Sequence, residues 1–237
     1  GGIVIQQGAL SVGVTTTLGA STVTLQDASN NFVGNVVLDS AGSVNLRDQN
    51  AVTLEGSASS LNIQAGTEIS QSAALNISGT SKLIAPNIDL NDSSNGFGGA
   101  VTVNAIEQAT VRASGNLSVG GIAASMNVTA QNELRLANST VGALNAAAQQ
   151  ITQSDSVTVT GATTLTAQGA ILLNTSNDFG GVVNPSLGLR WRATDSVLLR
   201  GGWNTSFRAP SLAQVGAGTS LSSGALPCSV GSEFYTS

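Results

Sequence analysis

Few side chains in this chain of 237 residues belong to the types that commonly carry catalysis. There is no His, so the commonest general base and the commonest metal ligand are both absent. The single Cys228 therefore lacks the His partner that a thiol protease needs. The only Lys is Lys82, and no G-x-x-x-x-G-K-[ST] phosphate-binding loop occurs. These absences argue against thiol-protease and P-loop chemistry.

One acidic pair could still carry chemistry, because paired carboxylates perform glycan cleavage. Asp89 and Asp92 are the closest pair among the 13 acidic residues, and they flank Leu90–Asn91, where we expect a strand to give way to a turn. Asp commonly caps such turns, so we interpret both as turn residues. The alternative is a polysaccharide-degrading β-helix, in which Asp89→Asn or Asp92→Asn abolishes activity. The glycine-rich nonapeptide repeat of calcium-binding β-helices is missing, and we expect no catalytic residue, metal or cofactor.

The composition narrows the class of protein. Charged residues make up 9% of the chain, the net charge is −5 and no run of Lys or Arg occurs, which argues against a nucleic-acid partner. Val, Leu, Ile and Ala recur throughout, unlike in disordered chains. No apolar run approaches the roughly 18–20 residues of a spanning helix. Because the chain begins at Gly1 without a signal segment, we expect a piece of a longer protein, with any export signal upstream.

Three segments align with one another without a gap: Val4–Val36, Ile69–Val101 and Ile151–Val183. Each carries a Gln near its start and an Asn two residues before a Phe. The Gln residues are Gln6, Gln71 and Gln153, and the Asn/Phe pairs are Asn30/Phe32, Asn95/Phe97 and Asn177/Phe179. Self-similarity at fixed offsets indicates a repeat architecture. The second offset is longer than the first, which predicts one added coil with apolar pairs at Met126/Val128 and Leu134/Leu136.

The Asn and the Phe of each repeat predict a corner beside the core. Asn tolerates a left-handed backbone and bonds to nearby backbone groups, so we expect each repeat Asn at a tight corner. We expect the Phe that follows to fill the core there. The alternative, an Asn-lined ligand site, is the weaker interpretation.

The apolar residues of positions 1–183 come in pairs one residue apart, such as Val23/Leu25 and Val44/Leu46. This spacing puts both side chains on one face of a strand. Gly, Asn, Asp and Ser interrupt the pattern about every 8 residues, which predicts short strands. A sandwich or barrel is the usual interpretation of such spacing. The gapless repeat, the low aromatic content and the Thr, Ser and Asn residues that could form ladders favour an all-β parallel β-helix, or β-solenoid, instead.

The string ITQSDSVTVTGATTLTAQGAILLNTSNDFGG at Ile151–Gly181 resembles the repeats of large bacterial surface proteins of the filamentous-haemagglutinin and autotransporter-adhesin type. The resemblance covers about residues 1–183. It implies a right-handed β-helical shaft that is exported and displayed at the cell surface. The amino-terminal secretion domain of that family has no counterpart in this sequence.

The composition changes near Asn184. Residues 184–237 hold both Trp residues, the only Tyr and Cys, three of the four Pro and four of the seven Arg. Apolar residues alternate with Gly and Arg at Leu187, Leu189 and Trp191, and a second alternating stretch includes Val197 and Leu199. The pattern predicts an antiparallel hairpin with one mostly apolar face, and we expect an irregular tail after it. Strands of outer-membrane barrels and amphipathic hairpins of soluble sheets both show this pattern.

The segment NPSLGLRWRATDSVLLRGGWNTSFRAPSLAQV resembles part of the barrel of TonB-dependent outer-membrane receptors, with a typical motif at Phe207, Arg208, Ala209, Pro210 and Ser211. The resemblance implies uptake of siderophores, cobalamin or carbohydrates by the whole receptor. A hairpin of this size cannot close a barrel and transports nothing by itself. The string DFGGVV at Asp178–Val183 completes the third repeat and also resembles the residues that precede NP in many of these receptors. Both a genuine gene fusion and a chimera made by misassembly of sequence reads could join the two parts at such a string.

We therefore expect a non-enzymatic, adhesin-like solenoid at the surface or outer membrane of a Gram-negative-like bacterium. Its expected partners are glycans or proteins of a host or neighbouring cell. The alternative is a receptor fragment, attached to the outer membrane only if the full barrel exists. Nothing in the sequence indicates a homo-oligomer.

Overall fold

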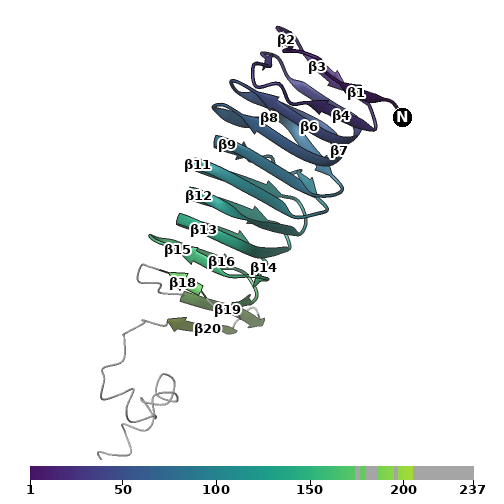
Figure 1. Ribbon diagram of the computed structural model, residues 1–237. Helices are drawn as coiled ribbons and strands as arrows, with labels where there is room; N and C mark the ends of the chain where they lie inside the picture. The colour runs from purple at the N-terminus through teal and green to yellow at the C-terminus, as the bar shows by residue number, and fades with distance from the viewer. Residues whose placement is uncertain (174–176, 180–185, 195–196, 205–237) are drawn as a thin grey trace, which may run out of the picture. The chain divides into compact units, whose positions relative to one another are not determined.

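The computed structural model describes residues 1–173, 177–179, 186–194 and 197–204, which form strands and connecting turns (Figure 1). No helix in these ranges is long and apolar enough for a membrane crossing. The chain divides into two compact units, Gly1–Gly181 and Val182–Ser237. The predicted all-β fold is confirmed.

The first unit is a parallel β-solenoid of about nine turns, in which each strand lies beside its equivalent in the next coil (Figure 1). Paired residues on successive coils are 17 to 21 positions apart. The predicted parallel β-helix is therefore confirmed. Its strands are β1 (Ile3–Ile5), β2 (Ser11–Val12), β3 (Thr16–Leu18), β4 (Thr22–Leu25), β5 (Asn31–Phe32), β6 (Val36–Asp48), β7 (Val52–Ala65), β8 (Glu68–Ile77), β9 (Ser81–Leu90), β10 (Gly96–Phe97), β11 (Val101–Ala113), β12 (Leu117–Ala130), β13 (Glu133–Ala148), β14 (Gln150–Gln153), β15 (Val157–Val159), β16 (Thr163–Ala167), β17 (Ile171–Leu172) and β18 (Asn177–Phe179).

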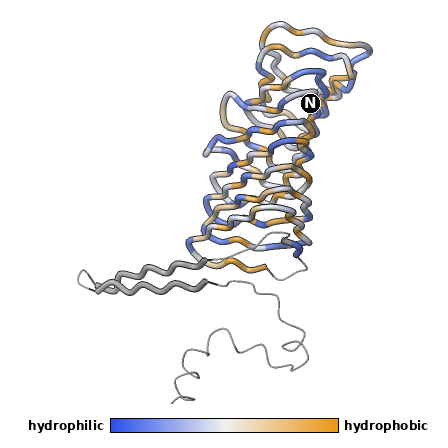
Figure 2. The backbone as a smooth tube through the Cα atoms, turned by 90° about the vertical axis from the view of Figure 1, so that its left-hand side faces the viewer, coloured by the Kyte–Doolittle hydropathy of each residue, from blue (hydrophilic) through white to orange (hydrophobic). Residues whose placement is uncertain are grey.

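A single hydrophobic core runs through the coils. Alternate residues of each strand point inward, and Figure 2 shows the matching alternation of apolar and polar positions along the chain. On β9, for example, Leu83 and Leu90 are fully buried while Lys82 and Asp89 are exposed. Each coil thus stacks its apolar residues on those of its neighbours, which is why the V-x-L pairs recur in the sequence.

The central strands are longer than the short strands that the sequence predicted. Seven of them run for 10 to 16 residues. They turn corners through shifts of register rather than by ending, for example between Val119 and Gly121 opposite β13. Gly56 and Gly121 adopt positive φ values of 98° and 131° at these corners. Glycine is the residue that adopts this backbone without steric cost, so a Gly can mark a bend within a strand as well as its end.

The extra residues of the second repeat form a coil, as predicted. β12 pairs in parallel with β11 on one side and β13 on the other. Met126, Val128, Leu134 and Leu136 are all buried in the common core. The insertion therefore lengthens the solenoid without interrupting it.

The second unit contains an antiparallel pair, β19 (Ser186–Thr194) and β20 (Val197–Asn204), in which Leu187 lies opposite Trp203 and Trp191 opposite Leu199. The predicted hairpin is confirmed. The Phe207–Ser211 motif and the predicted irregular tail lie outside the described residues, so the receptor resemblance stays a prediction from the sequence.

Candidate functional site

The most regular polar feature of the solenoid is a reciprocal pair of side-chain amides, here called the Gln–Asn clasp. In the second repeat, Gln71 Nε2 donates to Asn95 Oδ1 and Asn95 Nδ2 donates to Gln71 Oε1, both at 2.9 Å. Asn95 Oδ1 also accepts the Leu75 N–H at 2.8 Å, and Asn95 Nδ2 also donates to the Leu90 carbonyl at 3.2 Å. One buried amide thus joins segments from two successive coils.

The first repeat contains the same clasp. Gln6 Nε2 donates to Asn30 Oδ1 at 2.8 Å, and Asn30 Nδ2 donates to Gln6 Oε1 at 2.9 Å. Asn30 Nδ2 also donates to the carbonyls of Leu25 and Arg47, both at 3.1 Å, and Arg47 lies on the following coil. The clasp therefore fixes neighbouring coils to one another.

The third repeat completes the set. Asn177 Nδ2 donates to Gln153 Oε1 at 3.0 Å, and Gln153 Nε2 donates in return to Asn177 Oδ1. Gln153 Nε2 also donates to the Asp155 carbonyl, as Gln6 does to Gly8 and Gln71 to Ala73. Equivalent geometry in three repeats indicates a structural element of the repeat, because in each one the same two amides bond to one another across neighbouring segments.

Asn30 and Asn95 lie at turns, but without the left-handed backbone that Asn tolerates. Among the described residues, Ser40 is the non-glycine residue with a positive φ, so Asn30 and Asn95 do not have left-handed backbones. Both are completely buried, and each closes a turn by donating its N–H to the carbonyl of Asp27 or Asp92. The side chain is used for coil-to-coil hydrogen bonds, which leaves no free amide to line a ligand site.

The Phe that follows each Asn lies on a short strand at the same corner. Phe32 and Phe97 are 2% and 7% exposed, within the common core. Phe179 lies on β18, opposite Val159 of β15, and its side chain falls outside what the structure describes. A buried carboxylate supports the first corner, because Asp48 accepts the backbone N–H groups of Phe32 and Asn50, each at 2.6 Å.

Asp89 and Asp92 lie on either side of the end of β9. Asp92 Oδ1 accepts the Ser94 N–H at 2.8 Å, as Asp27 does for Ser29 in the first repeat, so Asp92 caps its turn. Asp89 is exposed and lines a shallow depression with Glu68, Asn87, Ile88, Asn91, Gln108 and Thr110. In the described part of the chain, no three His, Cys, Asp or Glu residues come together as a potential metal-ligand set.

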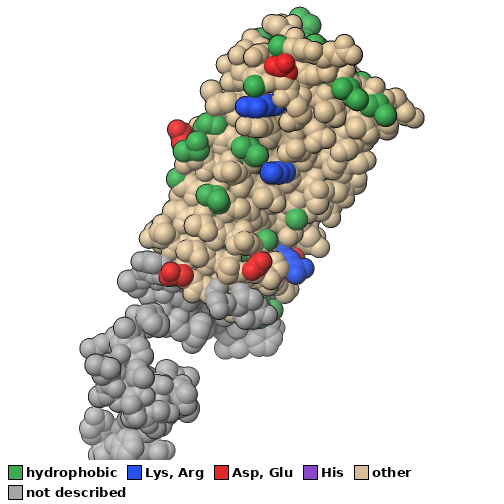
Figure 3. Space-filling model, viewed as in Figure 1, with side chains coloured by type: hydrophobic (Ala, Val, Ile, Leu, Met, Phe, Trp, Pro, Cys, Tyr) green, Lys and Arg blue, Asp and Glu red, His purple; other side chains and the backbone are tan. Residues whose placement is uncertain are grey.

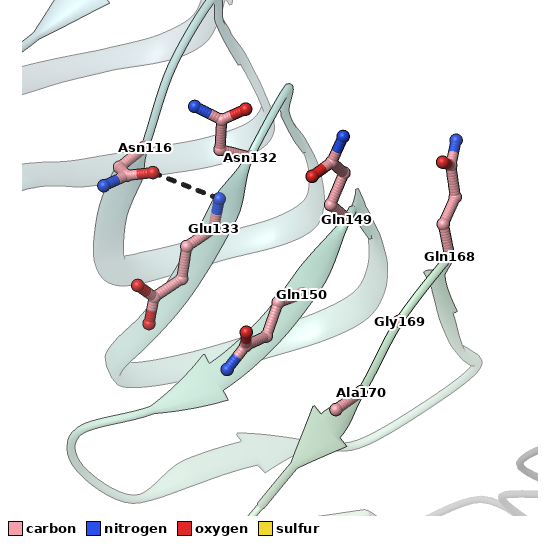
Figure 4. Close-up of a pocket in the computed structure, with 8 residues that line it drawn as sticks. All are labelled: Asn116, Asn132, Glu133, Gln149, Gln150, Gln168, Gly169 and Ala170. Atoms are coloured by element: carbon pink, nitrogen blue, oxygen red, sulfur yellow. Dashed lines mark hydrogen bonds between the residues drawn. The ribbon is translucent and has the colours of Figure 1, made fainter.

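A second depression lies over the corners of the last described coils and is lined mainly by amides (Figure 4). Asn132, Gln149 and Gln168 project side by side from successive coils, and all three are exposed. Asn116 Oδ1 accepts the Glu133 N–H at 3.2 Å, and Glu133 Oε1 accepts from Thr152 Oγ1 at 2.6 Å. The row offers neutral donors and acceptors, which suit hydroxyl or amide groups of a partner.

One face of the solenoid also has mostly neutral side chains. On the face shown in Figure 3, charged side chains are few and scattered among neutral groups. Polar ladders continue from coil to coil, with Asn62 donating to Asn45 and Ser60 to Ser43, both at 3.1 Å. Such ladders repeat one hydrogen-bonding motif along the axis.

Residues 1–39, 41–104 and 123–186 match the model of a family described as repeats of unknown function (DUF5649). The chain belongs to this repeat family. No curated protein and no solved structure matches it. The three matched ranges end at residues 39, 104 and 186. Each end lies shortly after the last residue of one of the three aligned segments, which are Val36, Val101 and Val183. Residues 105–122, between the second and third matches, hold the later part of β11 and the start of β12, and the pairing of these two strands shifts register between Asn104 and Gln108.

Both members of each clasp stand out in the sequence, but they were not predicted to pair with one another. The signal was present, because each Gln lies 24 positions before its Asn in all three repeats. Two amides at a constant separation slightly longer than one coil are brought to adjacent corners by the winding of the chain. The amide row in Figure 4 gave no such signal, because Asn132, Gln149 and Gln168 fall at unequal spacings.

Proposed function

We propose that this DUF5649 solenoid is a non-enzymatic structural segment, a shaft that spaces other parts of a surface protein. The observation that carries the proposal is the continuous parallel pairing from β1 to β17, with one core through all the coils. A solenoid of this kind is extended by adding coils, and its stability comes from contacts between neighbours. Spacing is a function that this architecture performs without a reactive site.

The clasps support a mechanical role. Each one ties a corner to a neighbouring coil through a reciprocal amide pair, whose Asn is completely buried in the first two repeats, so coils resist sliding or splaying at that corner. Cross-coil ladders such as Asn45–Asn62 add further links on the outside. These contacts fix the register between neighbouring coils, which a force across the axis of the solenoid would otherwise shift.

Display at a bacterial cell surface and adhesion to glycans or proteins are part of the same proposal. They are based on the resemblance of the repeats to those of bacterial surface proteins and on the neutral, amide-rich depression near Gln149. The row formed by Asn132, Gln149 and Gln168 is the contact that we propose for a glycan, since amides exchange hydrogen bonds readily with sugar hydroxyls. Binding on a glycan array that Gln149→Ala/Gln168→Ala abolishes, with unchanged unfolding, would support this contact.

Antibodies raised against residues 41–104 test the location. Source cells should be labelled while intact, and permeabilisation should add little signal. Labelling that requires permeabilisation contradicts surface display. A separate assay tests the absence of catalysis: release of oligosaccharides from polyuronates that Asp89→Asn or Asp92→Asn abolishes would show an enzymatic β-helix instead.

A further inference from the structure

The first coil of the solenoid exposes apolar side chains at its outer edge. Ile3, Val4 and Ile5 of β1 are 67%, 40% and 69% exposed, and Leu10 is 36% exposed. Within the described residues, β1 pairs with β4 alone. We call β1 together with Leu10 and Val12 the N-terminal edge.

The second repeat shows what covers this edge when a coil lies on it. Val4 and Leu10 align with Ile69 and Leu75, which are both 0% exposed. Ile69 lies opposite Val52 and Leu75 opposite Gly56, so β7 is the strand that covers them. The same positions are therefore interior wherever a preceding coil is present.

The backbone of the N-terminal edge is equally ready for pairing. Gly2 O accepts from Ser21 N and Gln6 N donates to Thr24 O, so these groups face β4. Because successive residues of a strand point their polar groups to opposite sides, the N–H and C=O of Ile3 and Ile5 face the open side. Soluble proteins usually protect such an edge with charge or Pro. The segment Gly1–Gln26 contains no charged side chain and no Pro.

The outward positions of β1 are also unusual within this molecule. Ile3 and Ile5 align with Glu68 and Ser70 of the second repeat, which are polar as outer positions of a solenoid normally are. Apolar residues there gain from a neighbouring coil whose outer side chains lie over them. Inner and outer faces of the edge thus favour the same occupant.

We propose that the N-terminal edge binds a further coil of the same repeat, added in parallel and in the register that β7 takes on β8. The occupant presents apolar residues like Val52 and Leu54 inward and closes its corner with a Gly like Gly56. This assignment rests on the edge alone and does not depend on surface display. One position of the first repeat fits such a coil less well. Val14 aligns with Gly79 of the second repeat, where an added Cβ would lie 2.7 Å from the Ser59 carbonyl oxygen of the preceding coil.

The test grafts a copy of residues 49–65 directly before Gly1 of the full chain. The copied Val52 then precedes Val4 by the same chain separation at which Val52 precedes its partner Ile69. The copied Ala65 precedes Gly1 as Ala65 precedes Gly66. A matched control carries Val52→Asp and Leu54→Asp in the copied segment only, and a third graft adds Val14→Gly.

Amide hydrogen exchange, followed by NMR, reads the edge directly. We expect exchange of the Ile3 and Ile5 N–H groups to slow at least tenfold in the graft and to stay fast in the control, with β12 unchanged in both. Val14→Gly should slow it further. Unchanged exchange in both grafts overturns the proposal. So does a symmetric dimer of the unmodified chain, seen by sedimentation, that Ile5→Asp dissociates, because the occupant is then a second copy.

Discussion

At the scale of single residues, the Gln–Asn clasp explains why polar side chains recur inside an apolar core. A buried amide left unpaired is costly, but Asn95 uses both its oxygen and its nitrogen in at least two hydrogen bonds each. The alternative of an apolar residue would leave the Leu75 N–H and the Leu90 carbonyl without these partners. The clasp therefore specifies which corner meets which coil as well as filling space.

Removing one half of a clasp should destabilise the solenoid strongly. Asn95→Ala strips partners from Gln71, Leu75 N and Leu90 O at a completely buried position, and each unsatisfied buried group costs about 1–3 kcal/mol. We expect a loss of about 2–5 kcal/mol in the free energy of unfolding, measured by chemical denaturation. Asn91→Ala, at an exposed Asn four residues earlier, should change it by less than about 0.5 kcal/mol.

The pairing itself is testable by a double-mutant cycle. Gln71→Ala and Asn95→Ala remove two ends of the same interaction, so their effects should not add. We expect the double variant to be more stable than the sum of the single losses implies, by about 1 kcal/mol or more. Additive losses would mean that the two amides act separately.

The residue scale is also where prediction from the sequence was weakest. The types and spacing of Gln71 and Asn95 were visible, but whether an Asn uses its amide at a left-handed corner or on a neighbouring coil depends on what the winding places beside it. Asp48 carried no signal at all, since the N–H groups that it accepts belong to Phe32 and Asn50, one of them a full coil away. Long-range partners of this kind follow only from the register.

At the scale of strands, glycine sets where a coil bends. An added Cβ at Gly121 would lie 1.9 Å from the Val103 carbonyl of the preceding coil, and its φ of 131° disfavours any L side chain. The sequence pattern suggested Gly as a strand terminator, which is correct at turns but missed these bends. The register shifts beside Gly56 and Gly121 show that the ladder continues through them.

Gly121→Ala should therefore open the contact between β11 and β12. Backbone strain of this type costs about 1–3 kcal/mol, and the clash with the Val103 carbonyl adds to it. Thermal unfolding followed by circular dichroism should show a lower midpoint. Gly115→Ala is the matched control, because a Cβ there meets no atom within 4 Å and its effect should be small. Equal shifts for the two variants would contradict the assignment of strain to the bend.

At the scale of the whole molecule, the repeat together with the spacing of apolar residues predicted the architecture. Gapless offsets and V-x-L pairs led to a parallel solenoid with an added coil, because coil stacking requires the same side-chain pattern in each turn. The hairpin β19–β20 followed from alternation around Leu187 and Trp191. The length of the strands was not predicted, because a corner at which the strand continues has the same residue types as a turn at which a strand ends.

Deletion of one whole coil tests this architecture most directly. Asn104 lies opposite Ile122, so removing residues 105–122 joins Asn104 to Ala123, which takes the place of Ala105 in the core. Every later strand keeps its inward and outward faces. We expect a folded rod, with a β-type circular dichroism spectrum and a cooperative transition, shorter by about 5 Å, one strand spacing, in small-angle scattering.

Deletion of half a coil is the control that separates register from length. Removing residues 105–113 takes away half as many residues but joins Asn104 to Ser114, a corner residue whose N–H donates to the Asn95 carbonyl. The buried positions of β12 then no longer meet those of β9, and the added coil cannot stack. Contacts between neighbours are the source of stability in a solenoid, so this smaller deletion should be the more destructive one. Collapse of the whole-coil variant as well would show that these coils fold only as a complete set, and the modular shaft would have to be abandoned.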